Sequence, residues 1–398
     1  MPNAVIVDAI RTAGGKRNGS LSGWHPADLA AELLTALSER NNLDPALVED
    51  VIMGCVMQVG AQGANIGRNA ALAAGWPESV PGTTIDRQCG SSQQSAHFGA
   101  QGVMAGAYEI VVAAGVEVMS LVPMGASMMV KDVGFPFGDR VMARYADVGG
   151  LVPQGISAEM IADKWGLSRE DLDEFGARSQ QRAARATAEG RFDNEIIGVK
   201  AKLKDKETGA VKDLDDLVVA DEGIRPDTTA ESLAALKPAF KPDGKVTAGN
   251  SSQITDGASA ALIMSEEKAR ELGLTPRARF HTFALAGVDP VTMLTGPIPA
   301  TAKVLDKAGL SIDDIDLFEV NEAFASVVLA WEKELKPDMD RVNVNGGAIA
   351  LGHPLGCSGT KLLATLLNEL ERTGGRFGLQ TMCEGGGMAN ATIIERLG

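Results

Sequence analysis

The chain has few aromatic side chains and lacks an excess of basic charge. Of its 398 residues, 4% are aromatic, and 37 Lys and Arg residues stand against 52 Asp and Glu residues, for a formal net charge of −15 at pH 7. Because such a charge repels phosphate backbones and anionic headgroups, we expect neither nucleic acid nor a membrane surface as a partner. An anionic substrate would have to be bound by a local group of donors.

Long hydrophobic runs and paired cysteines are absent as well. No stretch of about 18 uninterrupted apolar residues occurs, so the sequence predicts no membrane span, and the apolar run at 4–7 is too short for a signal peptide. The four Cys residues form no C-x-x-C pair, and the four His residues have no H-E-x-x-H spacing. We therefore expect no metal site and no disulfide, in a cytoplasmic protein whose thiols are core residues or reactive groups.

The rest of the composition is that of a folded protein. Hydrophobic residues make up 45% of the chain and charged residues 22%, which is ordinary globular usage, and the length favours two or three packing units. Short apolar runs alternate with longer helical patterns. This alternation indicates an α/β architecture in which helices cover a buried sheet.

The chain shows signs of an internal duplication. Asp50 begins a strand-like segment and Asp314 begins a similar one 264 residues later. Ser91 and Ser358, which are 267 residues apart, each begin a helical segment. These two offsets predict that one α/β unit occurs twice.

Residues 120–247 separate the two units and are rich in charge, Met and Gly. Within them, Ser168 begins a capping-box pattern ahead of a helix, and residues 196–219 alternate as half-exposed strands do. After them, a small-residue segment up to Met264 is predicted to be a helix. The sequence thus predicts three parts: a first half at 1–119 that is completed by 248–272, an inserted domain at 120–247, and a second half at 273–398.

Cys89 lies in a turn of small and polar residues that leads into a predicted helix. A thiol at a helix N-terminus is close to the positive end of the helix dipole, which lowers its pKa toward the range of a reactive thiolate. The alternative is a buried structural cysteine, which is the commoner role of a Cys in such a turn.

His353 lies in a glycine-rich segment, residues 346–359, and is followed by a proline that restricts its backbone. A rigid loop at the end of a strand is a suitable support for a general base. The segment is neither a Walker A loop nor a G-x-G-x-x-G turn. A structural histidine in a glycine-rich bend is the alternative.

Two further segments carry polar groups at the ends of predicted strands. Cys383 is followed by the glycines at 385–387, whose N–H groups could form an oxyanion hole, and a hairpin turn is the alternative. Asn321 directly follows a predicted strand at 316–320, at the edge where open α/β sheets bind ligands. The alternative for Asn321 is a helix N-cap.

Together these segments resemble the thiolases. The motifs Cys-Gly-Ser, Asn-Glu-Ala-Phe, Gly-His-Pro-x-Gly and Cys-x-Gly-Gly-Gly occur in this order, and the similarity covers essentially the whole chain. The resemblance implies the thiolase fold, a duplicated five-layered α/β/α/β/α architecture with an inserted loop domain. It also implies a homodimer or a dimer of dimers, that is, a homotetramer.

The resemblance implies a role for each motif. Cys89 is similar to the acyl-accepting nucleophile, and His353 is similar to the base that activates it. Cys383 is similar to the acid/base that serves the acetyl carbon or the incoming thiol. Asn321 with His353 would hold one oxyanion hole through a water molecule, and the backbone N–H groups of Cys89 and Gly385 would form the other.

Coenzyme A is implied as a co-substrate, and no permanently bound cofactor is expected. The residues that match the family's contacts to the nucleotide and the pantetheine are Arg225, Ser232 and Ser252. From the residues alone, Arg225 is read as a surface charge and Ser252 as a helix cap.

The acyl pocket departs from the acetoacetyl-specific pattern. Where those thiolases carry a His-Met pair, this chain has Pro153 and Gln154, and Leu294 replaces a glycine. The stretch Met128 and Met129 is a further candidate for pocket lining. The Cys-Gly-Ser-Ser-Gln-Gln run is similar to that of degradative actinobacterial thiolases that act on bulky acyl chains, including steroid side chains.

We therefore expect an acyltransferase that cleaves 3-oxoacyl-CoA with CoA, through an acyl-cysteine, to acetyl-CoA and an acyl-CoA shortened by two carbons. Fatty-acid or steroid side-chain β-oxidation would be its setting. One alternative is a biosynthetic acetyl-CoA acetyltransferase that makes acetoacetyl-CoA. Another is a non-catalytic thiolase-like lipid carrier or scaffold subunit, and a ketoacyl synthase on the same fold is a weaker one.

Overall fold

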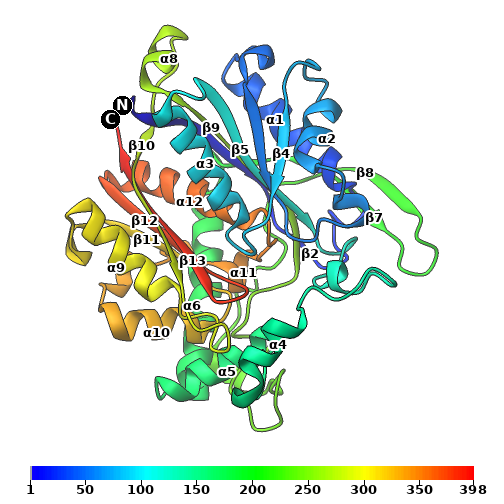
Figure 1. The fold of residues 1–398 in the computed structure, drawn as a ribbon, viewed down its shortest axis with the longest axis vertical. Helices are drawn as coiled ribbons and strands as arrows, with labels where there is room; N and C mark the ends of the chain where they lie inside the picture. The colour runs from blue at the N-terminus through cyan, green and yellow to red at the C-terminus, as the bar shows by residue number, and fades with distance from the viewer. Residues whose placement is uncertain (1) are drawn as a thin grey trace.

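The computed structural model describes residues 2–398, and one long sheet runs through it. The strand order is β11-β12-β13-β10-β1-β9-β5-β3-β4, and the short strands β2 and β6 pair with β9 and β1. Only two register pairs, Val5↔Arg279 and Ile6↔Ala278, join β1 to β10. The sheet therefore consists of two halves that touch at one corner, near both termini of the chain (Figure 1).

The first half contains strands and helices from both sides of residues 120–247. Its strands are β1 (Ala4–Thr12), β2 (Gly15–Lys16), β3 (Asp50–Gly54), β4 (Gly82–Ile85), β5 (Ile110–Val118) and β9 (Thr255–Ser265). Its helices are α1 (Pro26–Arg40), α2 (Ile66–Ala73), α3 (Ser91–Ala105) and α8 (Glu266–Glu271).

The second half repeats part of this order of elements. Its strands are β10 (Ala278–Gly287), β11 (Leu317–Val320), β12 (Phe377–Glu384) and β13 (Met388–Arg396). Its helices are α9 (Pro297–Ala308), α10 (Ala325–Leu335), α11 (Ala348–Leu351) and α12 (Ser358–Thr373).

The duplication predicted from the sequence is confirmed. β3 and β11, α3 and α12, and β5 and β12 each begin 267 residues apart, as do the 3-10 turns at Pro45–Leu47 and Ile312–Asp314. The counterpart of Asp50 is therefore Leu317. The match of Asp50 with Asp314 was wrong by three residues, because Asp314 still belongs to the 3-10 turn that precedes β11.

The elements form five layers. Helices α1 and α2 cover the outer face of the first half-sheet, and α9 covers the outer face of the second, where Trp331 of α10 packs on Phe318 of β11. Helices α3 and α12 pack against each other between the two half-sheets (Figure 1). The predicted α/β/α/β/α architecture is confirmed.

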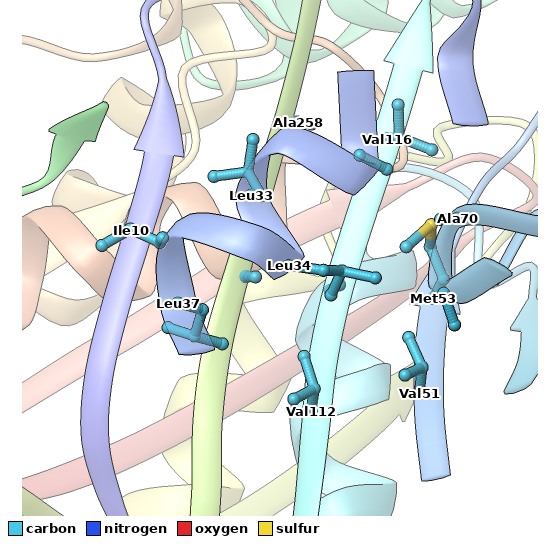
Figure 2. Close-up of a cluster of buried hydrophobic side chains, with 14 of the residues drawn as sticks. Ile10, Leu33, Leu34, Leu37, Val51, Met53, Ala70, Val112, Val116 and Ala258 are labelled. Carbon is cyan, nitrogen blue, oxygen red and sulfur yellow. The ribbon is translucent and has the colours of Figure 1, made fainter. Parts of the chain in front are cut away.

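The outer layer of the first half shows how the sequence specifies this packing. Leu33, Leu34 and Leu37 of α1 lie in one buried cluster that includes Val112 and Val116 of β5 (Figure 2). All five side chains are buried. Because burial of a Leu side chain is worth about 1.5–3 kcal/mol, the apolar stripe of α1 contributes strongly to the stability of this half.

The two central helices approach each other closely near their N-termini. A Cβ atom at Gly359 would lie 1.9 Å from the backbone N of Gln93, and one at Gly115 would lie 2.1 Å from the carbonyl O of Gly356. Only glycine fits at these positions. These glycines thus bring the first turns of α3 and α12 together and place Gly356 against β5.

The prediction of a small-residue helix up to Met264 was wrong. The segment forms β9, which pairs antiparallel with β1 on one side and with β5 on the other. Both edges of its backbone are therefore satisfied by sheet hydrogen bonds. Its small side chains leave room for α3 and α12, which both pack on β9, so tertiary packing outweighs the helix propensity of its Ala residues.

Residues 120–247 contain four α-helices and one β-hairpin. The elements are α4 (Asp139–Tyr145), α5 (Gln154–Lys164), α6 (Arg169–Ala188), β6 (Ile196–Ile197), β7 (Val199–Lys204), β8 (Val211–Val218) and α7 (Ala230–Ala234). The predicted capping box at Ser168 and the predicted strands within 196–219 are confirmed. The division of the chain at 119 and 247 stays a prediction.

No helix within residues 2–398 combines the length and the apolar character needed to cross a bilayer.

Candidate active site

The segments singled out in the sequence meet near the N-termini of α3 and α12. Cys89 lies just before α3, and its side chain packs in one hydrophobic cluster with Leu355 and Met382. Leu355 follows His353 closely in the chain, and Met382 precedes Cys383. Cys89, His353 and Cys383 are all exposed by 5% or less. The structure therefore brings together the buried segments that carry these three side chains, and their catalytic roles stay predictions.

The turn that carries Cys89 is fixed by polar contacts on both sides of it. The Gln88 N–H donates to Asp86 Oδ1 at 2.6 Å, and the Ser91 hydroxyl donates to the Gln88 carbonyl at 2.6 Å. Gln88 has a φ of 50°, a left-handed conformation that is costly for a residue other than glycine. Strained backbone of this kind next to a reactive group is typical of active sites.

The environment of the Cys89 thiol keeps it protonated. Burial raises the pKa of Cys89 to about 12, and the negative charge of Glu384 adds to this shift. The N–H groups of Gly385 and of Cys89 itself, together with the side chain of Gln154, face the sulfur and favour its thiolate form. The lowered pKa expected from the helix position was therefore wrong, because the cost of burial is larger than the effect of the dipole. A base has to take the proton during the reaction.

His353 lies in the loop between α11 and α12, so its predicted position at a strand end was wrong. Its Nδ1 lies 2.5 Å from the Ser358 hydroxyl, which itself donates to the Pro354 carbonyl at 2.8 Å. Ser358 can therefore only accept from Nδ1–H. This places the proton on Nδ1 and leaves Nε2, which lies 3.4 Å from Asn321 Nδ2, as an acceptor.

The same surroundings keep the ring of His353 neutral. Burial lowers the pKa of His353 to about 3, and the positive charge of Lys361 acts in the same direction. A neutral imidazole with a free Nε2 is the form that a general base requires.

Asn321 lies directly after β11 and is buried. Its backbone N–H donates to the Thr381 carbonyl at 3.0 Å, which ties it to β12. Phe324 caps α10, so Asn321 is not an N-cap and that alternative was wrong. The adjacent Glu322 accepts from the Ser179 hydroxyl at 2.5 Å and from the Ile349 N–H at 3.2 Å. These contacts link the end of β11 to α6 and to α11.

Cys383 lies on β12, one residue before the strand ends, and the glycines after it form the hairpin turn to β13. The hairpin is thus confirmed, and Gly386 and Gly387 have φ values of 81° and 80° that glycine tolerates best. The same turn directs the Gly385 N–H at the Cys89 sulfur. Burial raises the pKa of Cys383 well above its ordinary value, and the charges of Cys89 and Glu384 add to the shift.

Two residues near the nucleophile and the base were not predicted. Ser358, which sets the tautomer of His353, could have been found as a hydroxyl five positions after a His-Pro pair. Glu384 gives no comparable signal. It is fully buried against Gly90, where a Cβ atom would lie 2.1 Å from Glu384 Oε1, and burial raises its pKa to about 8.

The residues matched to coenzyme A lie on neighbouring segments. Gln253, next to Ser252, donates to the Gly223 carbonyl at 2.9 Å, so the segment of Arg225 lies beside that of Ser252. Arg225 is exposed and Ser252 is half-buried. Ser252 precedes β9 rather than a helix, so its reading as a helix cap was wrong. Ser232 lies on α7, where its hydroxyl donates to the Thr229 carbonyl at 2.8 Å. The next residue, Leu233, packs against Gly249, three positions before Ser252.

The remaining thiols and imidazoles have structural contacts. All four cysteines are free, and no group of three potential ligands in residues 2–398 is arranged to hold a metal ion. The Cys55 sulfur lies 4.0 Å from Glu117 Oε1, and Cys357 precedes the first turn of α12. His25 caps α1, and His97 Nε2 lies 2.7 Å from the Thr392 hydroxyl.

Comparison with known proteins assigns the chain to a family. Residues 4–267 match the family model of the thiolase N-terminal domain, and residues 274–396 match that of the thiolase C-terminal domain. The chain belongs to the thiolase family and is an acyltransferase. The family and the enzyme class predicted from the motifs are thus confirmed.

Three proteins of this family are similar to the chain over its whole length. A steroid 3-ketoacyl-CoA thiolase of Mycobacterium tuberculosis is 52% identical over 402 residues, covering 100% of this chain and 95% of the relative. A 3-ketoacyl-CoA thiolase of Aliivibrio fischeri is 49% identical, with 100% of both chains covered. The crystal structure of the Bacillus anthracis acetyl-CoA acetyltransferase superposes with a TM-score of 0.89 at 41% identity, covering 100% of this chain and 99% of that one.

Proposed function

We propose that the protein is a degradative thiolase that cleaves 3-oxoacyl-CoA with CoA. The products are acetyl-CoA and an acyl-CoA shortened by two carbons, in fatty-acid or steroid side-chain β-oxidation. The observation that carries this proposal is the meeting of segments that hold three buried groups: a thiol with N–H donors at its sulfur, a neutral imidazole with an unprotonated Nε2, and a second thiol. The thiolases of Mycobacterium tuberculosis and Aliivibrio fischeri support it.

In the first half of the reaction, His353 Nε2 takes the proton of the Cys89 thiol, and the sulfur attacks the 3-oxo carbonyl carbon. The N–H groups of Cys89 and Gly385 donate to the oxyanion that forms there. The bond between C2 and C3 then breaks, and its electron pair remains on the acetyl-CoA part as an enolate. Asn321 and His353, through a water molecule, stabilise the enolate oxygen, and the Cys383 thiol protonates its carbon.

In the second half, the Cys383 thiolate takes the proton of the CoA thiol. The CoA sulfur attacks the carbonyl carbon of the acyl-Cys89 thioester, and the bond from that carbon to Cys89 breaks. The Cys89 sulfur leaves and regains its proton from His353, while the shortened acyl-CoA departs. CoA thus acts as a co-substrate, for which we propose Arg225, Ser232 and Ser252 as contacts.

The same groups can run the condensation in reverse. The structural likeness to an acetyl-CoA acetyltransferase favours synthesis of acetoacetyl-CoA as the second candidate function. A non-catalytic carrier or scaffold is less consistent with the site, because its nucleophile, base and second thiol are all in place.

Acyl length separates the two candidate functions. Gln154 faces the Cys89 sulfur. Leu294 is buried, and Ser157, on the same helix as Gln154, donates to the carbonyl of Thr292, two residues before Leu294. Met128 and Met129 are exposed by 44% and 65%, and Ala126 is the residue of that turn that packs toward the cluster around Cys89. Within a single chain, the side chains of Met128 and Met129 therefore face solvent and do not pack beside Cys89, where we expected them to line the acyl pocket.

We expect kcat/KM to rise with acyl length from acetoacetyl-CoA to medium, long or bulky 3-oxoacyl-CoA. Each buried methylene adds about 0.8 kcal/mol, or roughly fourfold per carbon, until the pocket is filled. A steady-state series over chain lengths measures this. The double variant Pro153→His with Gln154→Met should flatten the series, and a wild-type profile that peaks at four carbons would establish the acetyltransferase instead.

For the assembly we propose a homodimer or a dimer of dimers, and for the location the cytoplasm. Two features support the assembly. β4 lies at one end of the sheet with an unpaired edge, and such edges readily pair with another chain. Large exposed apolar side chains are concentrated between residues 124 and 148, which is typical of an interface. They include Met129, Val133, Phe135 and Val148, exposed by 65%, 71%, 61% and 65%.

Light scattering after gel filtration should give two or four times the 41.5 kDa mass of the chain. If residues 124–148 hold dimers together, Val133→Asp with Phe135→Asp should reduce a tetramer to a dimer, because buried charges at an interface are strongly unfavourable. Leu47→Asp, at an exposed apolar residue in a distant turn, is the matched control. A monomeric wild-type protein would contradict the proposal.

A further inference from the structure

Lys361 is a buried lysine whose cation has only backbone partners. It lies on α12 and is 3% exposed. Its Nζ donates to the carbonyl oxygens of Leu351 at 2.8 Å and Gly352 at 3.1 Å. Among residues 2–398, no carboxylate lies within ion-pair distance of this ammonium group. These two carbonyls belong to the residues immediately before His353, at the C-terminal end of α11.

Burying the ammonium group of Lys361 costs more free energy than a purely structural role would justify. Removing a cation from water costs several kcal/mol, and an apolar side chain of similar volume is often at least as stabilising. The nearest opposite charges are already engaged, since Arg11 bonds Asp221 at 2.8 Å and Glu195 at 2.6 Å. Lys361 is therefore retained at a cost that its two carbonyl contacts have to offset.

Lys361 and Ser358, both on α12, hold His353 at two points. Ser358 lies three positions earlier on the same helix, where i and i+3 side chains share a face. Its hydroxyl accepts from Nδ1 of His353, so Ser358 holds the ring while Lys361 holds the backbone that enters the loop. On the other side, the His353 N–H bonds the Gln253 carbonyl and the Thr255 hydroxyl, both at 3.2 Å.

We propose that Lys361 is a positioning residue for the base of the reaction. By anchoring the carbonyls of Leu351 and Gly352, it fixes the backbone of His353 and keeps Nε2 directed at Asn321. This inference rests on the proposed function, because it takes His353 as the base that activates Cys89.

The charge of Lys361 also acts on the imidazole. Burial is the largest cause of the low pKa of His353, and Lys361 is the charged group that adds to it. The charged groups that act on Lys361 itself come from four places, namely Asp221 after β8, Arg11 on β1, Cys357 before α12 and Glu195 before β6. Without the cation of Lys361, the negative charges of Asp221 and Glu195 would exceed the positive charge of Arg11 near the loop. The pKa of His353 would therefore rise.

The test compares Lys361→Met with Lys361→Arg in the full-length enzyme. We expect Lys361→Met to slow acylation of Cys89 about 10- to 100-fold, as small displacements of a catalytic group do, with KM for the acyl-CoA changed by less than about threefold. Because a raised pKa protonates His353 at higher pH, the acid limb of the rate profile should move upward. Lys361→Arg keeps the cation and its donors and should recover most of the rate.

A matched control is Lys307→Met. Lys307 Nζ also donates to a backbone carbonyl, that of Phe283 at 2.8 Å, but it lies on the outer helix α9 and is exposed. Its replacement should leave acylation and the acid limb unchanged. If Lys361→Met does not fold, the comparison moves to Lys361→Gln, which keeps N–H donors without the charge and should still shift the acid limb upward.

Spectra of the ¹⁵N-labelled histidines give a readout that does not depend on turnover. The signal lost in His353→Ala identifies His353, and in Lys361→Met this signal should titrate at higher pH than in the wild type. If the wild type forms no acyl-Cys89, the proposed function fails. If it does, and Lys361→Met has wild-type acylation and an unshifted signal, only the role of Lys361 is refuted.

Discussion

Cys89→Ala should remove turnover almost completely, with a loss on the order of 10⁴-fold or more, because loss of a nucleophile eliminates the covalent route. The wild-type enzyme, incubated with an acyl-CoA in the absence of CoA, should gain one acyl mass. Peptide mapping should place that mass on Cys89. The thiol depends on a base, since burial raises its pKa to about 12, so acylation should be specific to a sulfur that the base can reach.

The other cysteines supply the controls for this experiment. Cys55 and Cys357 are buried, and burial raises the pKa of each of their thiols too. If the covalent step used another thiol, the acyl mass would appear on that cysteine, whereas the proposed mechanism leaves both unmodified. Cys55→Ala should acylate normally. Normal turnover by Cys89→Ala, or acylation of another cysteine in the wild type, would overturn the covalent mechanism.

The sequence indicated the elements whose patterns are local. The capping box at Ser168 predicted the start of α6, and the alternating pattern of residues 196–219 predicted the strands β7 and β8. The segment of β9 was misassigned because its small residues have no strand pattern of their own. Its conformation is decided by strands on both sides, one of them about 250 positions earlier in the chain.

The motifs pointed to the candidate reactive side chains, but the sequence could not show their protonation states. The dipole at the start of α3 suggested a lowered pKa for Cys89, and the effect of burial, which depends on the whole fold, reversed that sign. The free nitrogen of His353 is set by Ser358, five residues away, and faces Asn321, 32 residues earlier. Lys361 had no signal, because its partners are carbonyls.

His353→Ala and Cys383→Ser should separate the two proton-transfer steps. His353→Ala should slow acylation of Cys89 on the order of 10²–10⁴-fold, the usual loss for a missing general acid or base. Rapid-quench measurement of acyl-enzyme from a simple acyl-CoA tests this. His97→Asn is the matched control, since burial lowers the pKa of both histidines to about 3 and His97 bonds only Thr392.

Cys383→Ser should have a different effect, because the hydroxyl of serine is a far weaker acid than a thiol and cannot exchange protons with carbon near neutral pH. Acyl transfer from a simple acyl-CoA to Cys89 should remain partly intact, since no C–H bond changes in that step. Exchange of the α-protons of acetyl-CoA with deuterated solvent, followed by mass spectrometry, should be suppressed. If His353→Ala and Cys383→Ser abolish acylation to the same extent, the two groups do not divide the proton transfers as proposed, and Cys383 would have to act already in the activation of Cys89.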